Sequence, residues 1–371
     1  MNQSPLTHEH YSNTQFFSCL DGLRAFSILA VIWVHTGVNE TGWHILTRGQ
    51  IGVDLFFAIS GFLITTLLIR EKNKYGFISM KGFYLRRALR IFPIYYTVIA
   101  IYTLMVLLLE NNTDKGNQFF SNLPYFLTYT SNLFVENSGA VIFYFAWSLA
   151  AEEQFYMIWP SVERFLSGFR PVYIVLLILG LQGVTYLFIA QDPELSELLW
   201  IKILICIPPP ILGGVALAHL LHNKASFELL RPILGLKWAS LIYFTLFLAA
   251  LEFAMPRLGV WIIMLFMVGS IVINENNSMG GILRWRPLAY VGTISYGMYL
   301  MHMLAYNVTY RLLHFANIDN EWARYPVSVS LTILAAAISF HFYETKFLKL
   351  KSRFSRTETK KNIEDSMVQP S

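Results

Sequence analysis

Charged side chains are scarce in this 371-residue sequence. Asp, Glu, Lys and Arg make up 14% of it, whereas soluble globular domains carry roughly 25%. The deficit extends along the whole chain, and 55% of the residues are hydrophobic. A surface with so few charges is mostly not in contact with water. The composition therefore argues against an ordinary soluble enzyme and predicts an integral membrane protein.

Cysteine is also nearly absent. The two cysteines, Cys19 and Cys206, are far apart and have no cluster of His and Cys residues beside them. We therefore expect no disulfide framework and no metal site. We also expect no tightly bound cofactor. The N-terminal residues 1–17 are polar and contain no apolar core of a signal peptide. The first apolar segment is therefore expected to be an uncleaved membrane span.

Apolar runs of about twenty residues recur along the chain, and this is the length at which a helix crosses a bilayer. We predict an all-α integral membrane protein, a bundle of about ten transmembrane helices. The predicted spans cover residues 22–39, 51–69, 89–109, 141–162, 171–190, 198–221, 237–253, 258–274, 288–312 and 326–347. A further apolar stretch, 119–135, contains Asn122, Pro124 and Asn132. We interpret it as interfacial or re-entrant.

The placement of Lys and Arg orients the bundle. With a cytoplasmic N-terminus, most of the 28 Lys and Arg residues fall in cytoplasmic segments, as the positive-inside rule requires. The outer segments keep only Arg48, Lys115, Lys202, Arg257, Arg311 and Arg324. Both termini are therefore predicted to be cytoplasmic. The same placement accounts for the net charge of +5 without a nucleic-acid partner.

The predicted organisation has three parts. A polar cytoplasmic segment covers residues 1–18, and a transmembrane domain covers residues 19–350. A charged cytoplasmic tail, 351–371, is expected to be disordered because it holds too few apolar residues to form a core. No internal repeat and no fused soluble domain is visible in the sequence.

Ionisable side chains within a membrane are costly and by default indicate function. In the first span, Arg24 and His35 are eleven residues apart. At about 100° per residue they share one helix face, about 16 Å apart along the axis. Asp21 suits the N-cap of this helix. Alternatively, Arg24 anchors the helix at the cytoplasmic interface, and His35 hydrogen-bonds a neighbouring helix.

Asp54 begins the second span, at a depth similar to that of His35. A carboxylate next to an imidazole fixes its tautomer and increases its basicity. This arrangement would make His35 a general base. Alternatively, Asp54 caps its own helix or pairs with Arg48.

Three arginines, Arg86, Arg87 and Arg90, precede the apolar part of the third span on its cytoplasmic side. Arg87 and Arg90 are three residues apart and face the same way. They stand at a helix N-terminus, which favours anions, and paired guanidinium groups suit phosphate. The pattern predicts an anion site. The alternative is ordinary topological anchoring or contact with anionic lipid headgroups.

Two later spans also carry polar groups. Glu152 and Glu153 are about 100° apart on a helix, so at most one of them faces a given pocket directly. The alternative is a buried ion pair with a basic residue elsewhere. In the ninth span, Tyr296, Tyr299 and His302 recur every three to four residues as a polar stripe. We assign these three residues, with Glu153, to substrate binding, and His302 to a pocket wall or a structural role.

Five segments, taken in order, resemble acyltransferase family 3, which includes O-antigen and exopolysaccharide acetylases. They are LDGLRAFSILAVIWVH (20–35), GVDLFFAISGFLIT (52–65), FYLRRALRIFPIYY (83–96), WSLAAEEQFYMIWP (147–160) and SYGMYLMH (295–302). The specific features are the ten residues between Arg24 and His35 and the Arg-x-x-Arg pattern. The resemblance extends from about residue 18 to about residue 348.

The resemblance implies a multi-pass enzyme of the bacterial cytoplasmic membrane. Such an enzyme transfers an acyl group, usually acetyl from acetyl-CoA, to a hydroxyl of a sugar-containing acceptor. His35 would be the catalytic histidine, Arg24 its motif arginine, and Arg87 and Arg90 the Arg-x-x-Arg pair. Glu152 would be the characteristic carboxylate of the family.

These inferences predict a membrane O-acyltransferase whose donor substrate, acyl-CoA, enters from the cytoplasm. The residues expected to bind its phosphates are Arg24, Arg86, Arg87 and Arg90. His35, with Asp54 or Glu152 beside it, either deprotonates the acceptor hydroxyl or takes the acyl group itself. The resemblance implies a sugar-containing acceptor, such as a surface polysaccharide, its lipid-linked precursor or a small glycoside.

Two other classes of protein also place ionisable residues in membrane spans. A proton-coupled transporter would do so, but the sequence shows no repeated halves and no matched pair of broken helices. A non-catalytic receptor or scaffold would leave the alignment of Arg24 and His35 unexplained.

Overall fold

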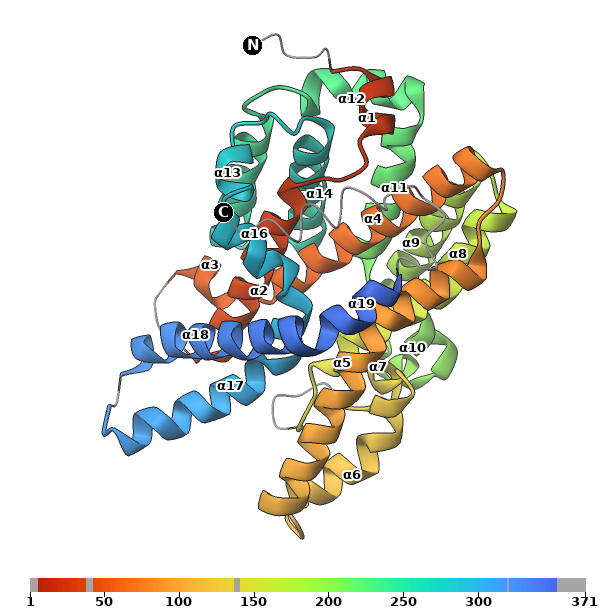
Figure 1. Ribbon diagram of the computed structural model, residues 1–371. Coiled ribbons are helices and arrows are strands. Elements are labelled where there is room, and N and C mark those ends of the chain that lie inside the picture. The colour runs from red at the N-terminus through yellow and green to blue at the C-terminus, as the bar shows by residue number, and fades with distance from the viewer. Residues whose placement is uncertain (1–5, 38–42, 137–140, 319, 352–371) are drawn as a thin grey trace.

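The computed structural model describes residues 6–37, 43–136, 141–318 and 320–351. Within these residues the chain forms helices and no β-strand, which confirms the predicted all-α class. Long helices cross one another, and α17 and α18 extend side by side as one arm (Figure 1). The predicted tail 351–371 lies, apart from Lys351, outside the described residues.

The first half of the chain forms the helices α1 (His8–Asn13), α2 (Cys19–His35), α3 (His44–Thr47), α4 (Ile51–Tyr75), α5 (Met80–Leu109), α6 (Asp114–Leu127), α7 (Ser131–Phe134) and α8 (Ala146–Phe165). The next part forms α9 (Arg170–Ile189), the 3-10 helix η1 (Pro193–Glu197), α10 (Leu199–Ile205), α11 (Pro209–His222), α12 (Lys224–Leu234), α13 (Ala239–Glu252) and α14 (Arg257–Ile273). The last part forms α15 (Gly280–Leu283), α16 (Arg286–Thr293), α17 (Ser295–Phe315), α18 (Glu321–Ser339), the π-helix η2 (Phe340–Glu344) and α19 (Thr345–Lys351).

Helices long and apolar enough to cross a membrane are found among the described residues. Four pass this test: Ile51–Tyr75, Met80–Leu109, Arg170–Ile189 and Trp322–Leu350. Two bent pairs also pass when each is counted as one span, namely α10 with α11 at 50° and α12 with α13 at 74°. Each of the ten predicted ranges overlaps a helix, but the number of spans remains a prediction.

Several helix boundaries differ from the predicted ones. The helix α2 begins at Cys19 after the N-cap Ser18, so Asp21 lies in its first turn and is not the cap. The predicted span 288–312 is divided between α16 and α17. The stretch 119–135 contains the end of the 14-residue α6 and the 4-residue α7. Both are shorter than the roughly 20 residues that a crossing needs.

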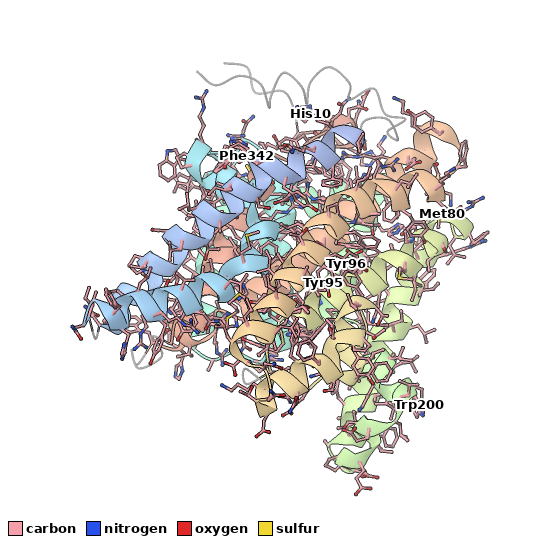
Figure 2. The ribbon with its side chains drawn as sticks, turned by 60° about the horizontal axis from the view of Figure 1, so that its bottom comes forward. His10, Met80, Tyr95, Tyr96, Trp200 and Phe342 are labelled. Atoms are coloured by element: carbon pink, nitrogen blue, oxygen red, sulfur yellow. The ribbon has the colours of Figure 1, made fainter. Side chains whose placement is uncertain are left out.

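An apolar outer surface supports the membrane assignment. The helix α9 is strongly apolar, yet only 17% of its most apolar window is buried within the protein. Trp200 of α10 and Phe342 of η2 are exposed aromatic side chains at the surface (Figure 2). Helices satisfy their own backbone hydrogen bonds, so such a surface is compatible with lipid.

Small residues allow α4 to pack closely against its neighbours. A Cβ atom on Gly61 would lie 2.0 Å from the carbonyl oxygen of Ile211, and one on Gly214 would lie 2.2 Å from that of Ala58. Such contacts are far too short for any side chain, so the backbones of α4 and α11 touch here. Gly61 and Gly214 thus permit the close approach of α4 and α11.

Candidate active site

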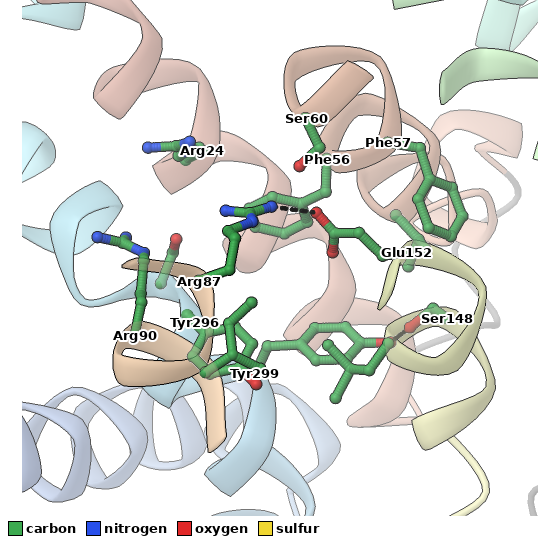
Figure 3. Close-up of a pocket in the computed structure, with 14 residues that line it drawn as sticks. Arg24, Phe56, Phe57, Ser60, Arg87, Arg90, Ser148, Glu152, Tyr296 and Tyr299 are labelled. Carbon is green, nitrogen blue, oxygen red and sulfur yellow. Dashed lines mark hydrogen bonds and ion pairs between the residues drawn. The ribbon is translucent and has the colours of Figure 1, made fainter. Parts of the chain in front are cut away.

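One cavity lies among α2, α4, α5, α8 and α17 (Figure 3). Its lining consists of Arg24, Val53, Phe56, Phe57, Ser60, Arg87, Arg90, Ile91, Ser148, Leu149, Glu152, Ser295, Tyr296 and Tyr299. Every lining residue belongs to one of the five segments 20–35, 52–65, 83–96, 147–160 and 295–302. Segments that are far apart in the chain therefore meet at one site.

Three guanidinium groups occupy one side of this cavity (Figure 3). Arg24 comes from α2, and Arg87 and Arg90 come from the early part of α5. This helix begins where Ser79 caps it by accepting a hydrogen bond from the backbone N–H of Gly82. The three-residue spacing of Arg87 and Arg90 then places both side chains on the cavity face.

Arg87 is held by an aromatic ring and a carboxylate from α8. Its guanidinium lies 3.6 Å from the centroid of the Tyr156 ring, a cation–π contact. Its Nη2 atom is 4.0 Å from Oε1 of Glu152, and the Tyr156 hydroxyl donates to the same oxygen. Arg87 and Glu152 are thus held next to each other in the cavity lining.

The positive charge of the cavity is only partly compensated. Arg24 pairs with Asp21 at 3.2 Å, and Arg87 pairs with Glu152. Within the described part of the chain, no carboxylate oxygen lies within 4.0 Å of the Arg90 guanidinium. A cavity with three guanidinium groups and incomplete pairing is suited to bind an anion, and phosphate groups match this geometry.

Arg86 differs from the other predicted arginines. Its Nη2 atom pairs with Oε2 of Glu71 on α4 at 3.3 Å, and Arg86 does not line the cavity. The reason is the helical period: Arg86 is adjacent to Arg87 and therefore about 100° away around α5. Arg86 therefore does not face the cavity together with the other three predicted phosphate-binding arginines.

The opposite end of the cavity is formed by Ser148 and Tyr299. Their hydroxyl oxygens are 2.6 Å apart, and the carbonyl oxygen of Phe145 lies within hydrogen-bonding distance of both, at 3.1 and 3.2 Å. This contact joins α8 to α17 and forms a polar wall (Figure 3).

His35 and His302 lie behind this wall and do not line the cavity. His302 is buried, with 1% of its surface exposed, and its ring centroid is 5.5 Å from that of Tyr299. The centroids of His35 and His302 are 4.9 Å apart. The structure therefore brings two imidazoles together next to the cavity, and it places His302 one layer behind the predicted pocket wall.

Asp54 does not contact His35. Its Oδ2 atom accepts a hydrogen bond of 2.8 Å from the indole N–H of Trp261 on α14. Asp54 is not among the residues of α4 that line the cavity, so its side chain lies at the flank of that face, toward α14. The ring of His35 is instead held through Nδ1, which lies 2.7 Å from the carbonyl oxygen of Val31. The predicted contact between Asp54 and His35 is therefore wrong.

Only one of the two adjacent glutamates faces the cavity, as their separation of about 100° around the helix predicts. Glu152 lines the cavity, whereas Glu153 does not. Tyr296 lines the cavity, and its buried hydroxyl has no hydrogen-bond partner among the described residues. An unpaired buried hydroxyl facing a cavity is available to a ligand.

Sequence reasoning missed several lining residues, including Ser148. Ser148 precedes Glu152 by four residues, which places both on one face of α8, so this spacing was a usable signal. Phe56 and Phe57 have apolar side chains that nothing in the sequence marks as functional. They line the cavity because of how α4 packs in the bundle. Within the described ranges, no group of three or more His, Cys, Asp or Glu residues is placed to hold a metal ion.

An apolar helical bundle with an arginine-lined internal cavity is the architecture expected of a membrane enzyme that handles an anionic substrate. The family model described as the acyltransferase domain matches residues 17–342. The chain therefore belongs to this acyltransferase family.

Two relatives carry names that describe O-acetyl transfer. The chain is 29% identical over 363 residues to the peptidoglycan O-acetyltransferase OatA of Listeria monocytogenes, covering 90% of this chain and 56% of that protein. It is 30% identical over 393 residues to the O-acetyltransferase OatA of Staphylococcus aureus, covering 94% of this chain and 62% of that protein. The chain thus spans about three fifths of the length of these relatives. No solved structure matches it.

Proposed function

We propose that this protein is a membrane O-acyltransferase that moves an acyl group, most simply acetyl, from acyl-CoA to a hydroxyl of a glycan. One observation carries the proposal: all fourteen residues that line the arginine-rich cavity come from the five segments that resemble the acyltransferase family. Family membership favours acyl transfer over proton-coupled transport.

The donor site in this proposal is the arginine side of the cavity. Arg24, Arg87 and Arg90 bind the phosphates of acyl-CoA, and the incomplete pairing of Arg90 leaves a charge-assisted contact for them. Arg86 is not part of this site because it pairs with Glu71. The hydroxyl of Tyr296, buried and without a partner among the described residues, is a further contact for the donor.

His35 performs the chemistry in this proposal. Its Nε2 atom takes the proton of the acceptor hydroxyl while the new C–O bond forms at the thioester carbonyl. The C–S bond then breaks. The imidazolium of His35 gives its proton to the departing sulfur, and CoA leaves as the thiol. A covalent acyl-histidine is the alternative route. His35 does not line the cavity; its ring contacts His302, which in turn contacts Tyr299 of the wall. In this proposal the wall therefore opens for the thioester to reach His35.

The acceptor we propose is a cell-surface glycan or its lipid-linked precursor. The names of the two relatives support an O-acetylated acceptor, and one of them names peptidoglycan. In this proposal the protein lies in the bacterial cytoplasmic membrane, with about ten spans and both termini in the cytoplasm. Its partners are then the bilayer, acyl-CoA and the glycan.

Reconstitution of the purified protein into liposomes tests this function. Isotope-labelled acetyl-CoA is supplied on one side, and peptidoglycan fragments or lipid-linked glycans on the other. We expect base-labile label on the glycan that depends on the protein. Release of CoA without label on any glycan, or no use of acetyl-CoA at all, would contradict the proposal.

A further inference from the structure

The pair formed by His35 and His302 has a feature that the proposed chemistry does not yet use. Each ring has its Nδ1 atom close to a backbone carbonyl oxygen: 2.7 Å from that of Val31 for His35, and 2.5 Å from that of Tyr299 for His302. A carbonyl oxygen only accepts hydrogen bonds, so Nδ1 carries the hydrogen in both rings. In both neutral imidazoles the free lone pair therefore sits on Nε2.

His302 is enclosed on its remaining sides. Its ring centroid lies 5.0 Å from that of Phe145 and 5.5 Å from that of Tyr299. Its Nε2 atom is buried and has no hydrogen-bond partner among the described residues. A buried acceptor without a partner is destabilising, so a fold that only needed to fill this space would be better served by an apolar side chain.

The segment before α8 holds these rings in place. Phe143 has a φ of 67°, which is strained for a bulky side chain and persists only where the surroundings enforce it. The segment then places Tyr144 5.9 Å from the His35 ring and Phe145 5.0 Å from the His302 ring, measured between centroids. A strained backbone at this point is a further indication that the arrangement of the two imidazoles matters to the protein.

We propose that His302 is a positioning residue that acts through His35. It remains unprotonated, and its Nε2 lone pair stabilises the imidazolium that forms when His35 takes the proton of the acceptor hydroxyl. Two protonated imidazoles in contact would repel each other, so the pair holds a single proton. This inference rests on the proposed function, and it gives His302 the role that the sequence assigned to Asp54.

Two substitutions distinguish the role of Nδ1 of His302 from the role of Nε2. His302→Asn keeps an N–H group near the position of Nδ1 but has no acceptor at Nε2, whereas His302→Gln can place its amide oxygen near the position of Nε2. His314→Asn, at the exposed end of the same helix, is the matched control. Each variant is purified and reconstituted into liposomes, and the initial rate of acetyl transfer to glycan is measured over a series of acetyl-CoA concentrations, together with the affinity of the protein for CoA.

We expect His302→Asn to lower the turnover number about a hundredfold, the scale of lost proton-transfer assistance. The KM for the donor and the affinity for CoA should remain near the wild-type values, and His302→Gln should recover part of the activity. Wild-type transfer by His302→Asn would overturn the inference while leaving the proposed function intact. Equal losses in both variants, or loss of CoA binding, would show a structural role and also overturn it. Wild-type protein that adds no acetyl would overturn the proposed function together with this inference.

Discussion

At the residue scale, the contact of Asp54 with Trp261 changes what a substitution should do. In Asp54→Asn, the amide oxygen of the new side chain can still accept the indole N–H, so the helix contact between α4 and α14 is retained. We expect transfer activity to stay within about fivefold of wild type, since one weakened hydrogen bond costs about 1 kcal/mol. Acetyl transfer by membranes that contain equal amounts of each protein measures this. A hundredfold loss of transfer activity would show that Asp54 takes part in the reaction after all.

His35 is the residue on which the proposed chemistry depends. His35→Ala should lower acyl transfer by at least about a hundredfold, because general-base assistance is typically of this size or larger. CoA affinity should be retained, since the three arginines of the cavity lie on the other side of the Ser148–Tyr299 wall. Transfer rate and CoA affinity are measured on the same purified sample. A variant that transfers acetyl at nearly the wild-type rate would move the catalytic centre elsewhere.

The sequence predicted residues of the site better than contacts within it. Arg24, Arg87 and Arg90 were identified by helical spacing and by the cost of charge in a membrane, and Glu152 by the family resemblance. All four line one cavity. The partner of His35 was not predictable, because similar depth on neighbouring helices does not fix which way a side chain points. Rotation of α4 about its axis turns Asp54 toward α14, and only tertiary packing determines that rotation.

At the scale of the helices, the closest packing is between α4 and α11. Gly61→Val would force a side chain against the backbone of Ile211, and we expect a loss of about 1–3 kcal/mol. The control is Gly180→Ala in α9, where an added Cβ atom meets nothing within 4 Å and helix propensity improves. Thermal unfolding in detergent compares the two. An unchanged melting temperature for Gly61→Val would show that α4 and α11 are not in contact.

Helix existence was predictable from hydropathy, whereas helix breaks were not. The ten apolar ranges each overlap a helix because an apolar run of this length has few alternatives in a bilayer. The break between α16 and α17 near Ile294 has no proline or glycine pair at that position in the sequence. It arises where α16 packs on α2, since a Cβ atom on Gly292 would lie only 1.8 Å from the carbonyl oxygen of Asp21.

At the scale of the whole molecule, the topology makes a separate prediction. Single cysteines at Lys115 and Arg257, both exposed positions, should react with a membrane-impermeant reagent from outside intact cells. A cysteine at Lys74, also exposed, should react only after the membrane is opened. The background protein needs Cys19 and Cys206 replaced first. Labelling at residue 115 from outside combined with labelling at residue 257 only from inside would show that the spans were miscounted.

The most direct test of the account is the affinity of the purified protein for acyl-CoA in three variants. The double variant Arg87→Ala with Arg90→Ala should bind more than about tenfold more weakly than wild type, because it loses two charge-assisted contacts. Replacement of both residues by Lys should restore only part of the affinity, since the bidentate geometry is lost. Arg86→Ala, the matched neighbour paired with Glu71, should bind as wild type does. Equal CoA affinity in wild type and the double Ala variant would contradict the account, because the cavity would then not be the donor site.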